Sequence, residues 1–198
     1  MYANLKPYLM TFIPIFVAVD IIGSIPLFLS VVEGKKRREK HRIIIMTVTT
    51  AALLAAIFMF LGKWVLIFLN ITIPDFQIAG GVLLFIISAR LLLPGTGKTL
   101  VAGSRDKDVG VFPLGTPLIT GPAVLTTTLI MVDTYGIAAT FISLAANMLF
   151  VWLVLAKADI IMKFLGVSGT RAFSKVMYIL LASIAVMLVR RGIMGILV

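Results

Sequence analysis

Long apolar runs separated by short polar segments occupy almost the whole chain. The runs cover residues 8–32, 43–69, 77–93, 111–132, 137–165 and 172–189. A helix needs roughly 20 mainly apolar residues to cross the hydrocarbon core of a bilayer. The pattern therefore predicts an all-α polytopic membrane protein with six transmembrane helices, in a single transmembrane domain over residues 1–198.

Composition excludes several other classes of protein. Hydrophobic residues make up 61% of the 198 residues and charged residues only 13%, whereas a soluble domain has about 45–50% apolar and about 25% charged residues. The chain has no cysteine, which excludes a disulfide framework and a thiolate metal site. The single histidine, His41, lies in a polar link, and Asp20 is the only acidic residue deep inside a run. Neither a serine–histidine nor a two-aspartate intramembrane protease fits, so we expect no enzyme, metal or cofactor.

Basic residues gather on alternate links between the runs. Of the 18 lysines and arginines, 14 fall within residues 33–42, 90–110 and 157–175, whereas Lys6, Lys63, Arg190 and Arg191 fall on the opposite side. Because basic loops stay in the cytoplasm, we expect a multi-pass protein of the cytoplasmic membrane with both termini outside. The basic run 35–42 has no aromatic residue, so it favours contact with anionic membrane lipids and not with nucleic acid.

A shift of 96 residues aligns the two halves of the chain. It places Ser24-Ile-Pro26 on Thr120-Gly-Pro122, and residues 68–72 on 164–168. The alignment predicts one repeat over about 1–94 and a second over about 111–198, joined by a cytoplasmic link at 95–110. Each repeat has three spans, an odd number, so the second repeat would be inverted relative to the first.

Glycines and prolines interrupt the first and fourth runs at positions that the shift brings together. Gly23-Ser-Ile-Pro26 lies in the first run, and Pro113, Pro117 and Pro122 lie in the fourth. A proline inside a helix removes a backbone hydrogen bond, and an unpaired backbone group in lipid costs several kcal/mol. We predict broken helices in spans one and four, with serine or threonine capping the new helix starts. A plain proline kink is the alternative at each position.

The ends of broken helices suit a small solute that carries both charges. Helix N-termini present free N–H groups and a positive dipole end, and helix C-termini present carbonyl oxygens. Two opposed breaks therefore suit the carboxylate and the ammonium of an amino acid. The candidate substrate-binding residues at the two breaks are Gly23, Ser24, Ile25, Pro26, Thr116, Pro117, Ile119, Thr120, Gly121 and Pro122.

Two polar side chains inside the spans add to this predicted site. Asp20 lies three residues before Gly23, and an aspartate at mid-span costs about 3 kcal/mol. It would pair with a substrate ammonium, take up a coupling proton or sodium ion, or cap the half-helix that begins near Gly23. Asn147 in the fifth run either contacts the substrate or hydrogen-bonds a facing helix. Gly80 and Gly81 are expected to let another helix approach closely.

The chain resembles the MarC family of integral membrane proteins. The resemblance is carried by Asp20-Ile-Ile-Gly-Ser-Ile-Pro26, by Ile78-Ala-Gly-Gly-Val-Leu-Leu-Phe85 and by Phe112-Pro-Leu-Gly-Thr-Pro-Leu-Ile-Thr-Gly-Pro-Ala123. It covers essentially the whole chain. Within the family, the chain looks most like archaeal transporters of small neutral amino acids, which take up glycine and alanine. Family members often have Asp-Pro in the first motif, where this chain has Asp20-Ile21.

Together, the residues and the resemblance lead to one expected function. We expect a secondary transporter that moves small neutral amino acids such as glycine and alanine, driven by a proton or sodium gradient. The residues alone imply only a transport site for something small, and the resemblance supplies the substrate class. A passive channel or an exporter for small solutes is the alternative. A homo-oligomer is left open.

Overall fold

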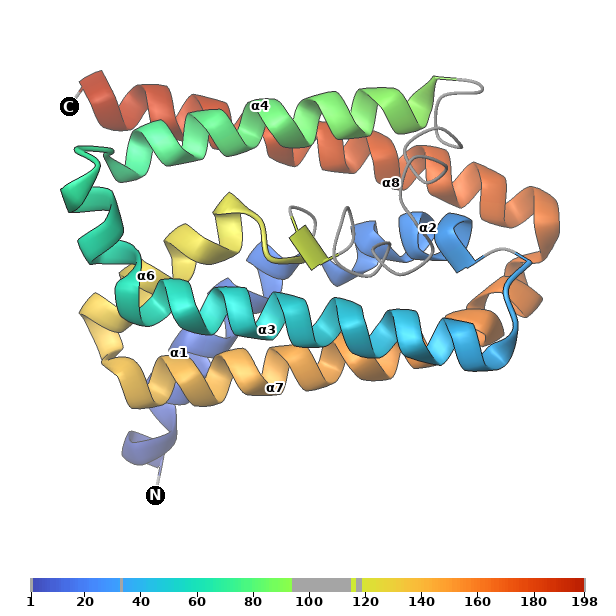
Figure 1. Cartoon of the computed structure of the whole chain (residues 1–198), viewed down its shortest axis with the longest axis horizontal. Helices are drawn as coiled ribbons and strands as arrows, with labels where there is room; N and C mark the ends of the chain where they lie inside the picture. The colour runs from blue at the N-terminus through green and yellow to red at the C-terminus, as the bar shows by residue number, and fades with distance from the viewer. Residues whose placement is uncertain (1, 33, 94–114, 117–118, 198) are drawn as a thin grey trace.

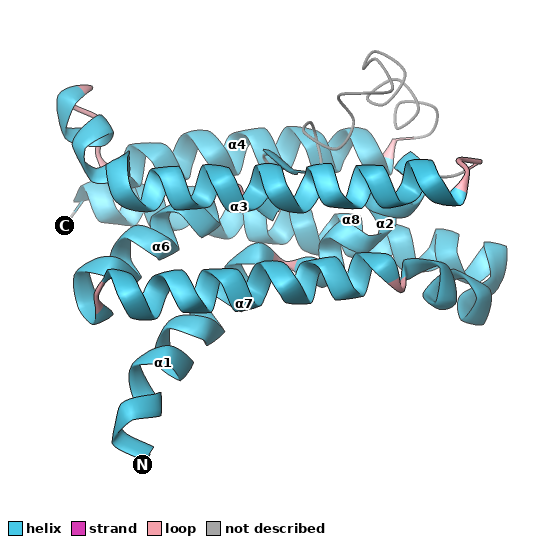
Figure 2. Cartoon of the chain, turned by 60° about the horizontal axis from the view of Figure 1, so that its bottom comes forward, coloured by secondary structure: helices cyan, strands magenta, loops and turns pink. Residues whose placement is uncertain are grey.

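The described residues form α-helices joined by short turns, with no strand. The computed structural model describes residues 2–32, 34–93, 115–116 and 119–197. The helices are α1 (Tyr2–Val19), α2 (Ile21–Val32), α3 (Arg37–Phe68), α4 (Ile73–Leu92), α6 (Pro122–Tyr135), α7 (Ile137–Ala156) and α8 (Ala158–Leu197). Figure 2 shows this all-helical structure, with α1 diverging from the bundle toward the N-terminus.

Two pairs of long helices flank two short ones. In Figure 1, α4 and α8 lie side by side along one edge, α3 and α7 lie along the other, and α2 and α6 lie between the pairs. The short helix α2 packs on α8 and α7, whereas α6 packs on α1, α3, α7 and α4. The centre of the bundle therefore contains two short helices whose first residues, Ile21 and Pro122, are buried.

Four helices are long and apolar enough to cross a membrane. They are α3, α4, α7 and residues 172–197 of α8. Only 28–39% of each apolar window is buried within the bundle, so the remaining apolar surface needs lipid around it. Trp64 and Phe68 of α3, for example, are 75% and 89% exposed. This is the surface of an integral membrane protein.

The two termini lie at the same end of the bundle (Figure 1). The turn between α2 and α3 lies at the opposite end. This arrangement agrees with an even number of membrane crossings. The predicted link 95–110 lies outside the described residues.

Three of the long helices, α3, α7 and α8, begin or end at residues other than the predicted ones. Residues 167–171 were expected to form a loop, but α8 is one helix of 40 residues that runs through them. The segment contains no proline, and a glycine in a helix costs only about 1 kcal/mol. The predicted fifth span, 137–165, ends instead at Ala156, where Lys157 leaves the helix. The basic residues from Arg37 onward are the first turns of α3 and not a loop.

Candidate functional site

The helical path of the first apolar run is interrupted at Asp20. Helix α1 ends at Val19, α2 begins at Ile21, and Asp20 between them has a φ of 45°. This left-handed conformation costs a side-chain-bearing residue about 1–2 kcal/mol, although aspartate tolerates it better than most residues. The Asp20 carbonyl still accepts the backbone N–H of Ser24 at 3.1 Å. The chain therefore changes direction at the one acidic residue of the run.

The predicted position of this interruption was wrong by a few residues. Gly23 and Pro26 lie inside α2, and so do Ser24 and Ile25. The Ser24 hydroxyl donates to the Ile21 carbonyl at 2.7 Å, so it does not cap a helix that begins near Gly23. The physical reason is that Asp20, and not the glycine or the proline, takes the non-helical conformation.

The second interruption precedes α6. The backbone N–H of Thr120 donates to the Gly115 carbonyl at 3.0 Å, a five-residue step that is wider than the four-residue step of an α-helix. Pro122 is the first residue of α6, after Gly121. A proline is well suited to that position because the N–H that it lacks would have no partner in the helix. The predicted site residue Pro117 lies outside the described residues.

The threonine expected to cap α6 bonds to another helix. The Thr120 hydroxyl is fully buried and donates to the Ala51 carbonyl of α3 at 2.9 Å. No side chain caps α6 at Gly121. Thr120 therefore fixes the second interruption to α3, and the N–H groups at the start of α6 keep no side-chain acceptor from the cap position.

One buried cluster contains residues from both interruptions. Val19 and Ile21, on either side of Asp20, belong to the same hydrophobic cluster as Ile119 and Ala51. The exposed fraction of Val19, Ile119 and Ala51 is 0%. Residues beside both interruptions thus belong to one extended core, and α1 packs against α6, although the two interruptions are about 100 positions apart in the sequence.

The two glycines of α4 allow close helix packing, as expected. A Cβ atom on Gly80 would lie 1.8 Å from Cγ of Pro122, and a Cβ on Gly81 would lie 2.7 Å from the Ala185 carbonyl oxygen of α8. Real Cβ atoms essentially never come this close to other atoms. Gly80 therefore sets the position of the α6 start, whereas Gly81 belongs to the α4–α8 contact.

Asn147 of α7 hydrogen-bonds the facing helix. Its side-chain Nδ2 donates to the Phe12 carbonyl of α1 at 3.3 Å and to the Ser143 carbonyl at 2.9 Å. The Ser143 hydroxyl donates to the Tyr8 carbonyl at 3.0 Å, and the hydroxyls of Ser143 and Thr11 also bond each other. These groups form a polar seam between α1 and α7. The amide oxygen of Asn147 is buried without a hydrogen-bond partner.

Two more buried side chains have unused hydrogen-bonding groups. The hydroxyl oxygens of Thr47 in α3 and Thr116 in the second interruption are buried and have no hydrogen-bond partner. Thr116 was a predicted site residue, but the sequence reasoning missed Thr47. The only signal for it is its spacing of four residues before Ala51, which puts both on the buried face of α3. The residues Thr47, Thr49 and Thr50 look alike in the sequence.

The described residues gather polar groups but no metal site. No group of three or more His, Cys, Asp or Glu side chains comes together in the part of the chain that the structure describes. The buried polar side chains there are hydroxyls of serine and threonine and the amide of Asn147. With the helix ends beside Asp20 and Pro122, such groups can bind a small solute through hydrogen bonds and helix dipoles.

Comparison with known proteins gives a family match over nearly the whole chain. Residues 5–197 match the MarC family of integral membrane proteins. A UPF0056 membrane protein of Methanocaldococcus jannaschii is 30% identical over 95% of this chain and 87% of its own length. A UPF0056 membrane protein of Pyrococcus abyssi is 27% identical over 96% of both chains. The UPF0056 inner membrane protein YhgN of Escherichia coli is 26% identical over 88% of this chain and 90% of its own. No solved structure matches the chain.

Proposed function

The chain belongs to the MarC family of integral membrane proteins, and we propose that it is a secondary transporter for small neutral amino acids such as glycine and alanine. The observation that supports this proposal is that residues beside the α1–α2 junction at Asp20, and Ile119 just before α6, belong to one extended buried core. In lipid, backbone groups at such interruptions are tolerated where protein or a water-filled cavity satisfies them. Interrupted helices near the bilayer midplane are typical of transporter binding sites.

The two ends of an amino acid find opposite chemistry at the two interruptions. The start of α6 at Pro122 offers N–H groups and the positive end of a helix dipole, which suit a carboxylate. Asp20 and the carbonyl end of α1 offer negative charge, which suits an ammonium. The close packing of Gly80 against Pro122 leaves little room there, which favours solutes with small side chains.

The helix pairing supports an inverted repeat. The 96-residue shift places α3 on the segment that contains α7, and α4 on residues 169–188 of α8. The two pairs of helices that the shift relates, α3 with α7 and α4 with α8, are also neighbours in the bundle. A two-fold relation in the membrane plane predicts such contacts between equivalent helices.

Coupling separates the proposed transporter from a passive channel. Asp20 is the acidic residue at the first interruption, so protonation or a sodium ion there would link solute movement to an ion gradient. A passive channel or an exporter for small solutes would use the same interruptions. His41 lies exposed on the first turns of α3, ten residues before Ala51, and no step of bond making or breaking enters the proposal.

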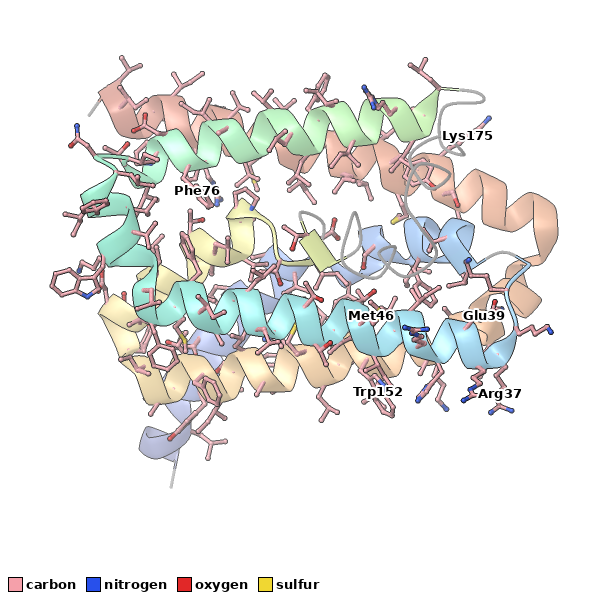
Figure 3. The ribbon with its side chains drawn as sticks, viewed as in Figure 1. Arg37, Glu39, Met46, Phe76, Trp152 and Lys175 are labelled. Carbon is pink, nitrogen blue, oxygen red and sulfur yellow. The ribbon has the colours of Figure 1, made fainter. Side chains whose placement is uncertain are left out.

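The basic end of the bundle is proposed to face the cytoplasm. Figure 3 shows Arg37 and Glu39 at the end of the bundle where Lys175 also lies, with Trp152 and Met46 closer to the middle. This end would contact anionic lipid head groups, each basic residue near the surface contributing about 1 kcal/mol. Both termini, which lie at the other end, would then be outside.

Uptake of labelled glycine into proteoliposomes tests the site. Asp20→Asn removes the charge and Thr120→Val removes the hydroxyl that fixes the second interruption to α3. We expect Asp20→Asn to lower the initial rate of glycine uptake at least about 10-fold, the effect of losing one charge-assisted hydrogen bond. Thr120→Val loses a neutral hydrogen bond of about 1 kcal/mol, so we expect it to lower the rate about 5-fold. Thr134→Val, which removes an exposed hydroxyl bonded only within α6, is the control. Uptake by both site variants at the wild-type rate would contradict the assignment.

A further inference from the structure

Threonine hydroxyls in the helices of this protein usually donate to a backbone carbonyl one turn earlier in the same helix. Thr49 donates to the Ile45 carbonyl at 2.7 Å, Thr126 to the Pro122 carbonyl at 2.8 Å and Thr140 to the Gly136 carbonyl at 2.9 Å. Thr47 differs from them. It lies inside α3 with an exposed fraction of 0%, and its hydroxyl has no hydrogen-bond partner.

Thr47 lies one turn before Ala51, the residue of α3 that bonds to the second interruption. The Thr120 hydroxyl bonds to the Ala51 carbonyl, and Thr47 and Thr116 each precede one of these residues by four positions. In Figure 1, α3 and the segment that leads into α6 run in the same direction. Four residues are about one turn of an α-helix, so Thr47 lies one turn before Ala51 on α3, and Thr116 precedes Thr120 in the segment that Thr120 bonds to α3.

The pair has the chemistry of a donor site. Both hydroxyl oxygens are buried and unpartnered, so each O–H is available to an acceptor from outside its own helix. Buried polar groups in proteins are nearly always hydrogen-bonded, and a pair that is not calls for a ligand or a partner in another state. Among the described residues, no buried side chain is a lysine or an arginine, so hydroxyls and the α6 N-terminus are the donors present.

We propose that Thr47 and Thr116 together bind the carboxylate of the transported solute. This inference rests on the proposed transport function and adds a residue of α3 to the site. Two hydroxyls match the two oxygens of a carboxylate, and the start of α6, two residues after Thr120, adds N–H groups and a positive dipole end. An ammonium group has no lone pair to accept these protons and would bind near Asp20. The solute would then lie between α3 and the two interruptions.

Glycine uptake by three variants tests the proposal. Thr47→Val removes the hydroxyl and keeps the shape of the side chain, and Thr47→Ser restores the hydroxyl. Thr49→Val is the matched control, because Thr49 is exposed on the same helix and its hydroxyl bonds only to its own backbone. We expect Thr47→Val to raise the KM for glycine at least about 10-fold, Thr47→Ser to stay near wild type, and Thr49→Val to have no effect. The melting temperature of purified Thr47→Val should equal that of the control.

Competition between labelled glycine and its analogues tests the carboxylate assignment on the wild-type protein. Glycinamide carries the amino group of glycine but no carboxylate, so it should compete poorly with labelled glycine, whereas alanine should compete well. Competition by glycinamide as strong as that by alanine would overturn the carboxylate assignment even if Thr47→Val did not fold. An unchanged KM in Thr47→Val would overturn the role of Thr47 and leave the transport proposal intact. Absence of wild-type uptake of both glycine and alanine would instead overturn the transport proposal and this inference with it.

Discussion

The buried faces of α7 and α3 differ in whether their side-chain donors are used. The 96-residue shift places Thr47 on Ser143 and Ala51 on Asn147. On α7, Ser143 and Asn147 donate to carbonyls of α1. On α3, the Ala51 carbonyl accepts from Thr120, while the Thr47 hydroxyl is unused. The buried face of α7 therefore anchors α1, whereas the buried face of α3 holds the second interruption and keeps the Thr47 hydroxyl for a ligand.

The largest effect of a substitution is expected at the contact between Gly80 and Pro122, which positions the second interruption. Gly80→Val puts a Cβ where Pro122 now lies, 1.8 Å from its Cγ, so α6 must shift. Overpacking of this kind costs about 1–3 kcal/mol, and we expect a lower melting temperature and loss of glycine uptake. Ala79→Val, at an exposed neighbouring position, is the control. A Gly80→Val protein that melts and transports like Ala79→Val would show that this contact does not position the site.

A substitution on the buried face of α7, which anchors α1, should lower the stability of the protein. Asn147→Leu removes the donors to the Phe12 and Ser143 carbonyls, and interhelical hydrogen bonds in membranes contribute about 1 kcal/mol. We expect a melting temperature below that of Ala146→Leu, which changes an exposed neighbour, whereas Thr47→Val should not be destabilised. Equal melting temperatures of Asn147→Leu and Ala146→Leu would show that the hydrogen bonds of Asn147 do not anchor α1, and that the buried faces of α7 and α3 do not differ in this way.

The smallest effect is expected near the C-terminal end of α3, where α3 meets the end of α6. Lys63 of α3 donates to Asp133 of α6 at 3.2 Å, and both side chains are more than half exposed. Exposed ion pairs contribute about 0–1 kcal/mol. Lys63→Gln and Asp133→Asn should each leave the melting temperature and glycine KM near wild type. A loss of uptake as large as that of Asp20→Asn would mean that this pair gates the site, and the comparison would then extend to the end of the bundle.

Much of the fold follows from apolar spacing alone. The runs 43–69 and 77–93 correspond to α3 and α4, because a helix in lipid must be both long and apolar. Helix ends were harder to predict. Residues 167–171 resemble a loop in composition, yet α8 continues through them, since glycines and polar residues weaken a helix without ending it.

The site was predictable in its region but not in its details. Glycines and prolines pointed to the first run, but the interruption lies at Asp20, whose left-handed backbone depends on the packing around it. Thr47 was missed because Thr47 and Thr49 are indistinguishable by type. Only the three-dimensional packing puts one on the buried face of α3 and the other on the exposed face. Likewise, the partner of Thr120 lies on a helix that is distant in the sequence.

Accumulation of labelled glycine against its own gradient tests the central claim most directly. Proteoliposomes containing the wild-type protein would receive an imposed proton gradient or, separately, an imposed sodium gradient. One of the two gradients is expected to raise internal glycine above the external concentration, and an ionophore that collapses that gradient should abolish the excess. Asp20→Asn should not accumulate glycine under either gradient. Glycine that only equilibrates in wild-type vesicles under both gradients would contradict coupled transport and indicate a passive channel.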